Sequence, residues 1–412
     1  MISIITNNTI YSKKQKQLFF VFILISLLNF GNYSFLQYNL YGVPSSNPLL
    51  FIIKNIRPFI PIIFLLYLFV DRNWQIKIFK LIKENKFIFL LCIIFVINSS
   101  ISSNILISFL YSIWLLSSII IVGLTVNNVN NTTDIFKFLK YGSTITLILV
   151  ISSFQMILIS GNEATFFSSK NYYAYPLLIY FVSELCLFQL IKFNKYKKLR
   201  IILLFLVFLT FFLSGRRSPT ICALIAVLIY FFNNNKFIFT LLIIFISTFG
   251  TIVISSNIFG VKIEESLTYR RFERINQNSN FYDSSYSERE LIWENYLKGF
   301  FDSPILGNGL NTSESTLKRH YSGDLEGYSY HNTFLQILVE SGFLGFLCFI
   351  IFLLQVLSKF LIKKNKLLIL SLFFPSLLIN WVETNFLPGQ LFFVFTITVW
   401  FFITSKRNVF EK

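Results

Sequence analysis

Histidine and arginine side chains gather in one hydrophilic stretch of an otherwise apolar chain. The stretch from about residue 255 to residue 331 holds both histidines of the protein, His320 and His331. Arginine suits forked, bidentate binding of phosphate, and a neutral imidazole accepts a proton near physiological pH. Four arginines of this stretch are candidates to bind an anionic substrate: Arg270, Arg271, Arg274 and Arg289.

His331 stands where the hydrophilic stretch gives way to an apolar run, so it is expected at a membrane surface. An imidazole in that place is able to take the proton of a substrate hydroxyl as a general base. The alternative is a structural histidine that caps the following helix or binds a lipid headgroup. His320 lies beside Lys318 and Arg319 and is expected to be an ordinary surface residue.

Arg216 and Arg217 are expected at the outer end of an apolar segment. Charged side chains at membrane depth are costly and commonly functional, although long side chains also extend to lipid headgroups. For Arg270, Arg271 and Arg274 the alternative is a solvated surface paired with neighbouring glutamates. The sequence thus predicts an anion site and leaves open which arginines line it.

The chain lacks the motifs by which enzymes bind nucleotides or catalytic metals. It has no P-loop, no G-x-G-x-x-G, no H-E-x-x-H and no G-x-S-x-G. No cofactor and no metal is therefore expected, and the substrate must arrive already activated. A lipid-linked sugar diphosphate meets this need, because arginines would stabilise the diphosphate leaving group while histidine activates the acceptor hydroxyl.

The elements that position these residues are expected to be transmembrane helices. The chain is 55% hydrophobic and 13% charged, whereas soluble domains carry about 25% charged residues. A spanning helix needs roughly 20 mostly apolar residues. By that criterion we expect about twelve spans, centred near Leu27, Ile63, Ile93, Leu115, Leu149, Tyr180, Val207, Leu224, Ile246, Phe349, Phe374 and Phe395.

The distribution of charge predicts the orientation. Val261–His331 carries 8 Lys and Arg against 11 Asp and Glu, while the rest of the chain carries 28 against 8. The basic excess lies in short links between apolar runs, which is the positive-inside pattern and argues against nucleic-acid binding. We expect a multi-pass protein of the bacterial inner membrane with both termini cytoplasmic. Its parts would be nine helices (1–254), a large periplasmic loop (255–331) and three helices (332–412).

The large loop is expected to contain short helices. Ser287 and Glu290 fit a capping box that would begin a helix, and Asp302 precedes a proline that would end it. Its aromatic face is expected to lie on the bilayer or the span ends, and comprises Trp293, Tyr296, Leu297 and Phe300. A glycine turn at 306–309 would let the backbone approach a ligand closely.

Three sequence pieces in the second half resemble the O-antigen ligase and O-antigen polymerase family of bacterial surface-polysaccharide assembly. The pieces are Ser214-Gly215-Arg216-Arg217-Ser218; Arg289, Trp293 and Phe300 with Pro304-Ile305-Leu306-Gly307-Asn308-Gly309; and His331-Asn332-Thr333-Phe334-Leu335-Gln336 with Glu340-Ser341-Gly342-Phe343-Leu344-Gly345. A weaker fourth piece is Lys170-Asn171-Tyr172-Tyr173-Ala174. Their order, and the large loop between them, also match.

The resemblance implies an all-α, GT-C-like membrane glycosyltransferase that uses an undecaprenyl-diphosphate-linked glycan without a metal. It implies that Arg216 and Arg289 bind the diphosphate and that His331 is the base. Asn332 and Glu340 would contact the glycan or orient His331, with a helix-packing role as the alternative for Glu340. Substrate contacts are also expected from Arg217, Arg270, Arg271 and Arg274.

The resemblance leaves the acceptor open. We favour a polymerase, which passes the glycan to the next lipid-linked unit, because the chain is rich in Phe and Ile and its first half diverges. The alternative is a ligase that passes the glycan to the lipid A core. A glycan transporter is the alternative of another class, although the charges, Glu184 excepted, gather at the outer edge. A chain-length regulator is a further expected partner.

Overall fold

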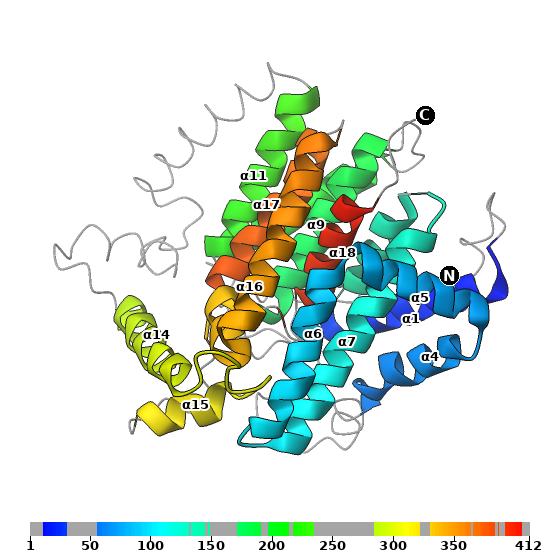
Figure 1. Ribbon diagram of the computed structural model, residues 1–412. Coiled ribbons are helices and arrows are strands. Elements are labelled where there is room, and N and C mark those ends of the chain that lie inside the picture. The colour runs from blue at the N-terminus through cyan, green and yellow to red at the C-terminus, as the bar shows by residue number, and fades with distance from the viewer. Residues whose placement is uncertain are drawn as a thin grey trace.

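The computed structural model describes residues 11–30, 56–131, 133–144, 147–148, 171–190, 197–213, 217–234, 284–321, 330–363, 366–383, 386 and 392–405. Within these ranges the protein is helical and contains no strand, in agreement with the predicted class. The helices, shown in Figure 1, are α1 (Lys13–Phe30), α4 (Phe59–Phe69), α5 (Arg72–Glu84), α6 (Lys86–Asn98), η2 (Ser99–Ile101), α7 (Ile105–Asn128), α9 (Asn171–Leu190), α10 (Lys197–Leu213), α11 (Arg217–Asn234), α14 (Ser284–Asp302), α15 (Ser313–His320), α16 (Thr333–Ile362), α17 (Lys366–Val382) and α18 (Phe393–Thr404).

The described helices include ten of the twelve predicted span centres, and the other two, near Leu149 and Ile246, lie outside the described residues. Two helices, α7 and α16, are each long and apolar enough to cross a membrane. Helices α4 and α5 together are also long and apolar enough, but the pair is bent by 117° between the two helices. The structure therefore supports a membrane protein, while the number of spans stays a prediction.

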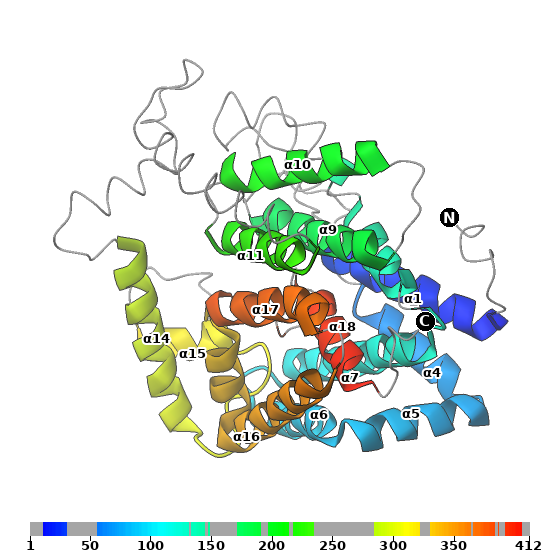
Figure 2. The same ribbon diagram turned by 90° about the horizontal axis from the view of Figure 1, so that it is seen from above.

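The apolar helices pack into layers. Figure 2 shows α11 between α9 and α17, with α10 on the far side of α9, and α16 alongside α6. Aromatic rings fill the core: Trp114 and Trp400 are buried, and the Trp400 ring centroid lies 5.9 Å from that of Phe349 on α16. The interior of this part of the bundle is therefore packed with side chains.

The basic link after the second predicted span forms a helix of its own, α5. Its apolar residues Trp74, Ile78 and Leu81 recur at helical spacing and are buried. The Lys77 ammonium group donates a hydrogen bond to Asn128 Oδ1 at the end of α7, over 2.8 Å. Helix α5 is thus an amphipathic helix packed against the bundle, where the sequence analysis expected a short basic link between two spans.

Helices α14 and α15 lie beside the start of α16, away from the other helices (Figure 1). They share a small core of their own with the start of α16, formed by Ile292, Tyr296, Leu317, Tyr330 and Val339. The Tyr296 and Tyr330 ring centroids lie 3.9 Å apart. Burial raises the pKa of the Tyr330 hydroxyl well above its usual value, so this core holds a neutral phenol.

Two expectations about α14 need correction. The helix begins at Ser284, so Ser287 lies inside it and is not the N-cap residue. Leu297 is 40% exposed, and Ile292 takes its place on the buried face because it is one turn before Tyr296. The predicted end at Asp302 is confirmed.

Candidate functional site

His331 lies at the start of α16 in a strained backbone conformation. Its φ is +47°, which is uncommon for a residue other than glycine and costs about 1–3 kcal/mol. Asn332 follows as the N-cap, and its side-chain oxygen accepts hydrogen bonds from Phe334 N at 2.8 Å and Leu335 N at 3.0 Å. The cap fixes the first turn of α16, and so holds the histidine at one place on the end of the helix.

The ring of His331 contacts Glu383, which the sequence analysis missed. His331 Nδ1 lies 3.0 Å from Glu383 Oε2, directly beyond the end of α17. A carboxylate at Nδ1 favours a proton there, which leaves Nε2 as the acceptor nitrogen. The pair therefore has the arrangement of a general base with an orienting acid. The sequence signal that could have identified Glu383 was its position as an acidic residue at the end of the eleventh predicted span.

Thr333 and Asn380 hold the Glu383 backbone in place. The Thr333 hydroxyl oxygen lies 3.0 Å from the Glu383 carbonyl oxygen and 3.0 Å from Asn380 Oδ1. The Asn380 amide in turn donates to Thr396 Oγ1 near the start of α18, over 2.9 Å. Both Thr333 and Asn380 are fully buried, so this polar chain ties α16, α17 and α18 together behind the His331–Glu383 pair.

The structure gives only part of the predicted arginine site. Arg217 opens α11 and Arg289 lies in α14, but their side chains are not among the described atoms. The other four predicted arginines lie outside the described residues: Arg216, Arg270, Arg271 and Arg274.

The start of α11 nevertheless lies at the same end of the bundle as the start of α18. The hydroxyl groups of Ser218 on α11 and Tyr175 on α9 are 3.5 Å apart. The Tyr175 ring packs on Phe392, directly before α18, with centroids 6.2 Å apart. The start of α11 therefore lies at the end of the bundle where α17 ends and α18 begins.

A break in α16 is stabilised by the loop Pro304–Gly309. At Gly342 the backbone leaves the helical conformation, with φ +64° and ψ −170°. Before the break, the carbonyl oxygens of Val339 and Glu340 accept hydrogen bonds from Asn308 N (3.0 Å) and Gly309 N (2.9 Å). We call this loop, with residues 339–344 of α16, the glycine clasp.

Beyond the break, the hydrogen bonds have the opposite direction, because α16 now donates and the loop accepts. Phe343 N and Leu344 N donate to the carbonyl oxygens of Pro304 (2.8 Å) and Ile305 (3.3 Å). Backbone groups that the break would leave without partners are thus paired with the loop. The clasp allows α16 to change direction without losing backbone hydrogen bonds.

Two glycines make this close contact sterically feasible. A Cβ on Gly342 would lie 2.4 Å from the Ile305 oxygen, and one on Gly307 would lie 2.4 Å from Gly342 N. Both residues also have positive φ, which glycine alone adopts without strain. The turn was predicted to approach a ligand, but its close approach is to α16.

Glu340 is fully buried below the clasp. Its Oε2 accepts from Gln336 Nε2 at 3.0 Å, and its Oε1 accepts from Thr312 N at 3.3 Å. These contacts link α16 to the segment before α15, whereas the hydrogen-bond partner of His331 is Glu383. A direct role of Glu340 or Asn332 in glycan binding therefore stays a proposal.

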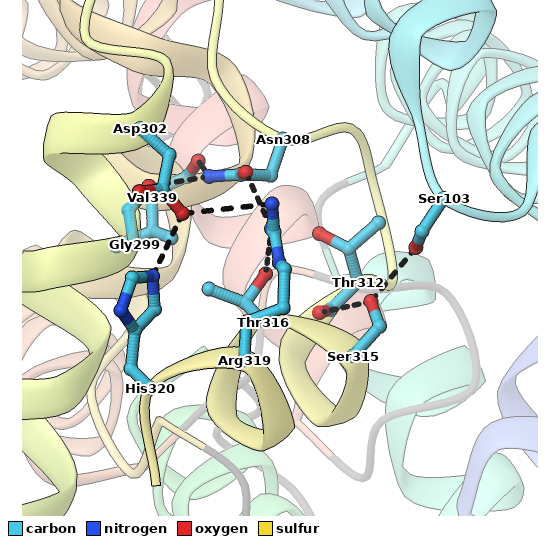
Figure 3. A network of polar contacts seen from close by, with 10 residues as sticks. All are labelled: Ser103, Gly299, Asp302, Asn308, Thr312, Ser315, Thr316, Arg319, His320 and Val339. Carbon is cyan, nitrogen blue, oxygen red and sulfur yellow. Dashed lines mark hydrogen bonds and ion pairs between the residues drawn. The ribbon is translucent and has the colours of Figure 1, made fainter.

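Figure 3 shows the polar network that joins α14 and α15 to the glycine clasp. The Asn308 amide nitrogen donates to the carbonyl oxygens of Gly299 (2.8 Å) and Val339 (3.1 Å), and its oxygen accepts from Arg319 Nη2 (2.7 Å). His320 Nε2 lies 2.7 Å from Asp302 Oδ2. His320 was expected to be an ordinary surface residue, and it is in fact paired with Asp302.

Glu184, the charge expected deep in the membrane, is fully buried in α9 between two cations. Its Oε2 lies 2.9 Å from the ammonium group of Lys140, and its Oε1 forms an ion pair with Arg200. A buried carboxylate with close cationic partners is common in structural roles. Among the residues described here, no group of three side chains suited to holding a metal ion occurs.

Residues 202–350 match the family whose description is O-antigen ligase. No match is found among the curated proteins compared. The matched region includes all three main sequence pieces, from Ser214 to Gly345, and it includes His331. The resemblance of the chain's second half to the O-antigen ligase and polymerase family is thereby confirmed.

Proposed function

We propose that the protein is a membrane glycosyltransferase that joins undecaprenyl-diphosphate-linked repeat units, as an O-antigen polymerase does. The observation that carries the proposal is the His331–Glu383 contact of 3.0 Å at the start of α16. It gives a histidine of the matched region an orienting acid, which a general base needs. The chain contains none of the common nucleotide motifs, which agrees with a donor activated by its own lipid diphosphate.

In the proposed reaction, His331 Nε2 takes the proton of the acceptor sugar hydroxyl as its oxygen bonds to the donor's anomeric carbon. The bond from that carbon to the lipid diphosphate breaks, and the leaving group departs with the bonding electrons. Arg216 and Arg289 stabilise its growing negative charge, with Arg217 as a neighbouring contact. The proton on His331 then passes to solvent, and no metal takes part.

The position of α11 supports this assignment of arginines. Ser218 follows directly on Arg216 and Arg217, and it contacts Tyr175, whose ring packs on Phe392. Phe392 directly precedes α18, and Glu383 directly follows α17. The proposed site is therefore a seam between the start of α11, the adjoining ends of α17 and α18, and the start of α16, on which α14, the helix that carries Arg289, packs.

The polymerase reading rests on the first half of the chain. The family match begins at residue 202, so the preceding helices lie outside it, in line with a divergent first half. A ligase that transfers the glycan to the lipid A core remains the second candidate, because the matched family is described as O-antigen ligase. In either case we propose an inner-membrane enzyme with cytoplasmic termini, a periplasmic loop and, for the polymerase, a chain-length regulator as partner.

The deciding experiment is electrophoresis and staining of the surface glycan from a strain that lacks this protein. Core capped with a single repeat unit identifies a polymerase, and bare core with accumulated lipid-linked polymer identifies a ligase. Complementation with Arg216→Ala, Arg289→Ala and His331→Ala then tests the site. Normal glycan from all three variants would show that the assigned residues are wrong.

The transporter alternative has its own outcome in a purified system. If the protein in detergent fails to join lipid-linked units, yet moves them across vesicle membranes, it is a transporter. The ion pairs of Glu184 with Lys140 and Arg200 are consistent with a structural role for this buried acidic residue of α9.

A further inference from the structure

Four large apolar side chains are exposed on α14 and the loop that follows it. Leu297 and Phe301 are 40% and 72% exposed, and Ile305 and Leu306 are 63% and 37% exposed. Leu297 and Phe301 are four residues apart, so they lie along one edge of α14. Exposed apolar groups that gather in this way mark an interaction surface. We call these four residues the apolar edge.

The apolar edge lies next to the point where α16 becomes a plausible spanning helix. From Phe343 to Ile362 the helix has about 20 residues, or about 30 Å at 1.5 Å per residue, which equals the hydrocarbon thickness of a bilayer. Phe343 and Leu344 are 57% and 43% exposed, as expected of lipid-facing side chains. The break at Gly342 therefore falls at the boundary of the hydrocarbon region.

The glycine clasp fixes the apolar edge at that boundary. Phe343 N and Leu344 N, the first donors of the spanning segment, bond to the carbonyl oxygens of Pro304 and Ile305. The backbone of Ile305 is thus held beside the first residues of the apolar segment 343–362. Exposed apolar side chains of both elements therefore lie close together at the clasp.

Polar residues occupy the neighbouring stripe of α14. Glu294, Lys298 and Asp302 are exposed and follow one another at intervals of four residues. Helix α14 therefore has an apolar edge and a charged edge side by side, the division expected of a helix that lies at a membrane surface.

We propose that the apolar edge inserts into the outer leaflet and contacts the acyl chains of phospholipids. In this arrangement Glu294 and Lys298 face water or headgroups, and α14 and α15 rest on the bilayer instead of projecting from it. The orientation follows the predicted topology, in which this end of α16 is periplasmic. The proposal concerns the position of α14 and α15 on the membrane, and it does not depend on the reaction that the protein catalyses.

The test is a nitroxide label placed by cysteine substitution in the full-length protein, reconstituted in phospholipid vesicles without any lipid-linked glycan. Phe301→Cys and Ile305→Cys report on the apolar edge, and Glu294→Cys is the matched control on the charged edge. Collision of the label with oxygen, which concentrates in hydrocarbon, is compared with collision with a water-soluble nickel chelate. Labelled wild-type protein corrects for Cys348, since the other three cysteines are buried.

We expect the ratio of oxygen to chelate collisions to be several-fold higher at positions 301 and 305 than at 294. Equal ratios at all three positions, with chelate access at 301, would overturn the proposal. Because Ile305 belongs to the clasp, Leu297→Cys replaces it if that variant fails to elute as wild type. Omitting lipid-linked glycan ensures that the hydrocarbon detected is phospholipid and not the polyprenyl chain of a substrate.

Discussion

The surroundings of His331 and His320 differ in the elements that they join. His331 Nδ1 lies 3.0 Å from Glu383 Oε2, a contact between the start of α16 and the end of α17. His320 Nε2 lies 2.7 Å from Asp302 Oδ2, a contact between the ends of α15 and α14. Both histidines thus have a carboxylate partner, although they are candidates for different roles.

The difference lies in how each carboxylate is used. Asp302 also pairs with Arg319, at 3.5 Å, and so joins the ends of α14 and α15 at the surface. Glu383 is held by the buried polar chain behind it, and it contacts the ring nitrogen opposite the one proposed as base. His331 also has a positive φ, while His320 ends a regular helix. A short distance to an acid therefore does not identify a base, whereas the geometry around the acid is informative.

The largest expected effect separates the two histidines directly. His331→Gln should lower the rate of joining lipid-linked units by about 10²–10⁴-fold, the usual contribution of a general base. His320→Gln, the matched control, should stay near the wild-type rate because it loses only a surface contact. The measurement is the glycan product formed by purified protein from a lipid-linked donor. Similar losses in the two variants would remove the distinction between the histidines.

A smaller loss is expected from substitution of the acid beside His331. Glu383→Gln should lower kcat by about 10- to 100-fold with little change in KM, because a displaced base reduces the rate of the chemical step. Asp302→Asn, its counterpart beside His320, should leave both constants unchanged. If Glu383→Gln raised KM alone, or lowered only the thermal stability, Glu383 would not orient His331.

Gly342→Ala tests whether the break in α16 positions the segment that carries His331. The backbone of Gly342, with φ +64° and ψ −170°, is in a region that is essentially restricted to glycine and costs another residue about 1–3 kcal/mol. The Cβ of an alanine would also meet the Ile305 carbonyl oxygen. The melting temperature and the rate should therefore both fall. Ser358→Ala, on an exposed face of the same helix, is the control and should behave as wild type. An unchanged rate in Gly342→Ala would show that His331 is positioned independently of the clasp.

The smallest expected effect concerns the cap of α16. Asn332→Ala should lower the free energy of unfolding by about 1 kcal/mol, the usual cost of losing an N-cap side chain. Asn332→Asp keeps an oxygen acceptor for Phe334 N and Leu335 N and should restore most of that stability. Chemical denaturation in detergent is the measurement. If the aspartate variant matched the alanine variant, the loss would come from something other than the cap.

Local sequence patterns predicted some ends of elements correctly. Helix α14 ends at Asp302 before a proline, and an apolar helix starts shortly after His331. Such signals depend on neighbouring residues alone. That Asn332 caps α16 was seen only in the structure. The pattern was misleading for Ser287, because α14 begins about one turn earlier, at Ser284. The helix α5 was not predicted, and its buried face of Trp74, Ile78 and Leu81 was recognised only in the structure.

The sequence by itself determined that this protein is helical and apolar, that its histidines lie in one stretch, and that its second half resembles the O-antigen ligase and polymerase family. Those features follow from composition, periodicity and motif order, which are local properties of the chain. Only the tertiary structure paired His331 with Glu383 and Gly307 with Gly342. These pairs are far apart in the sequence, and packing of whole helices decides which distant residues meet.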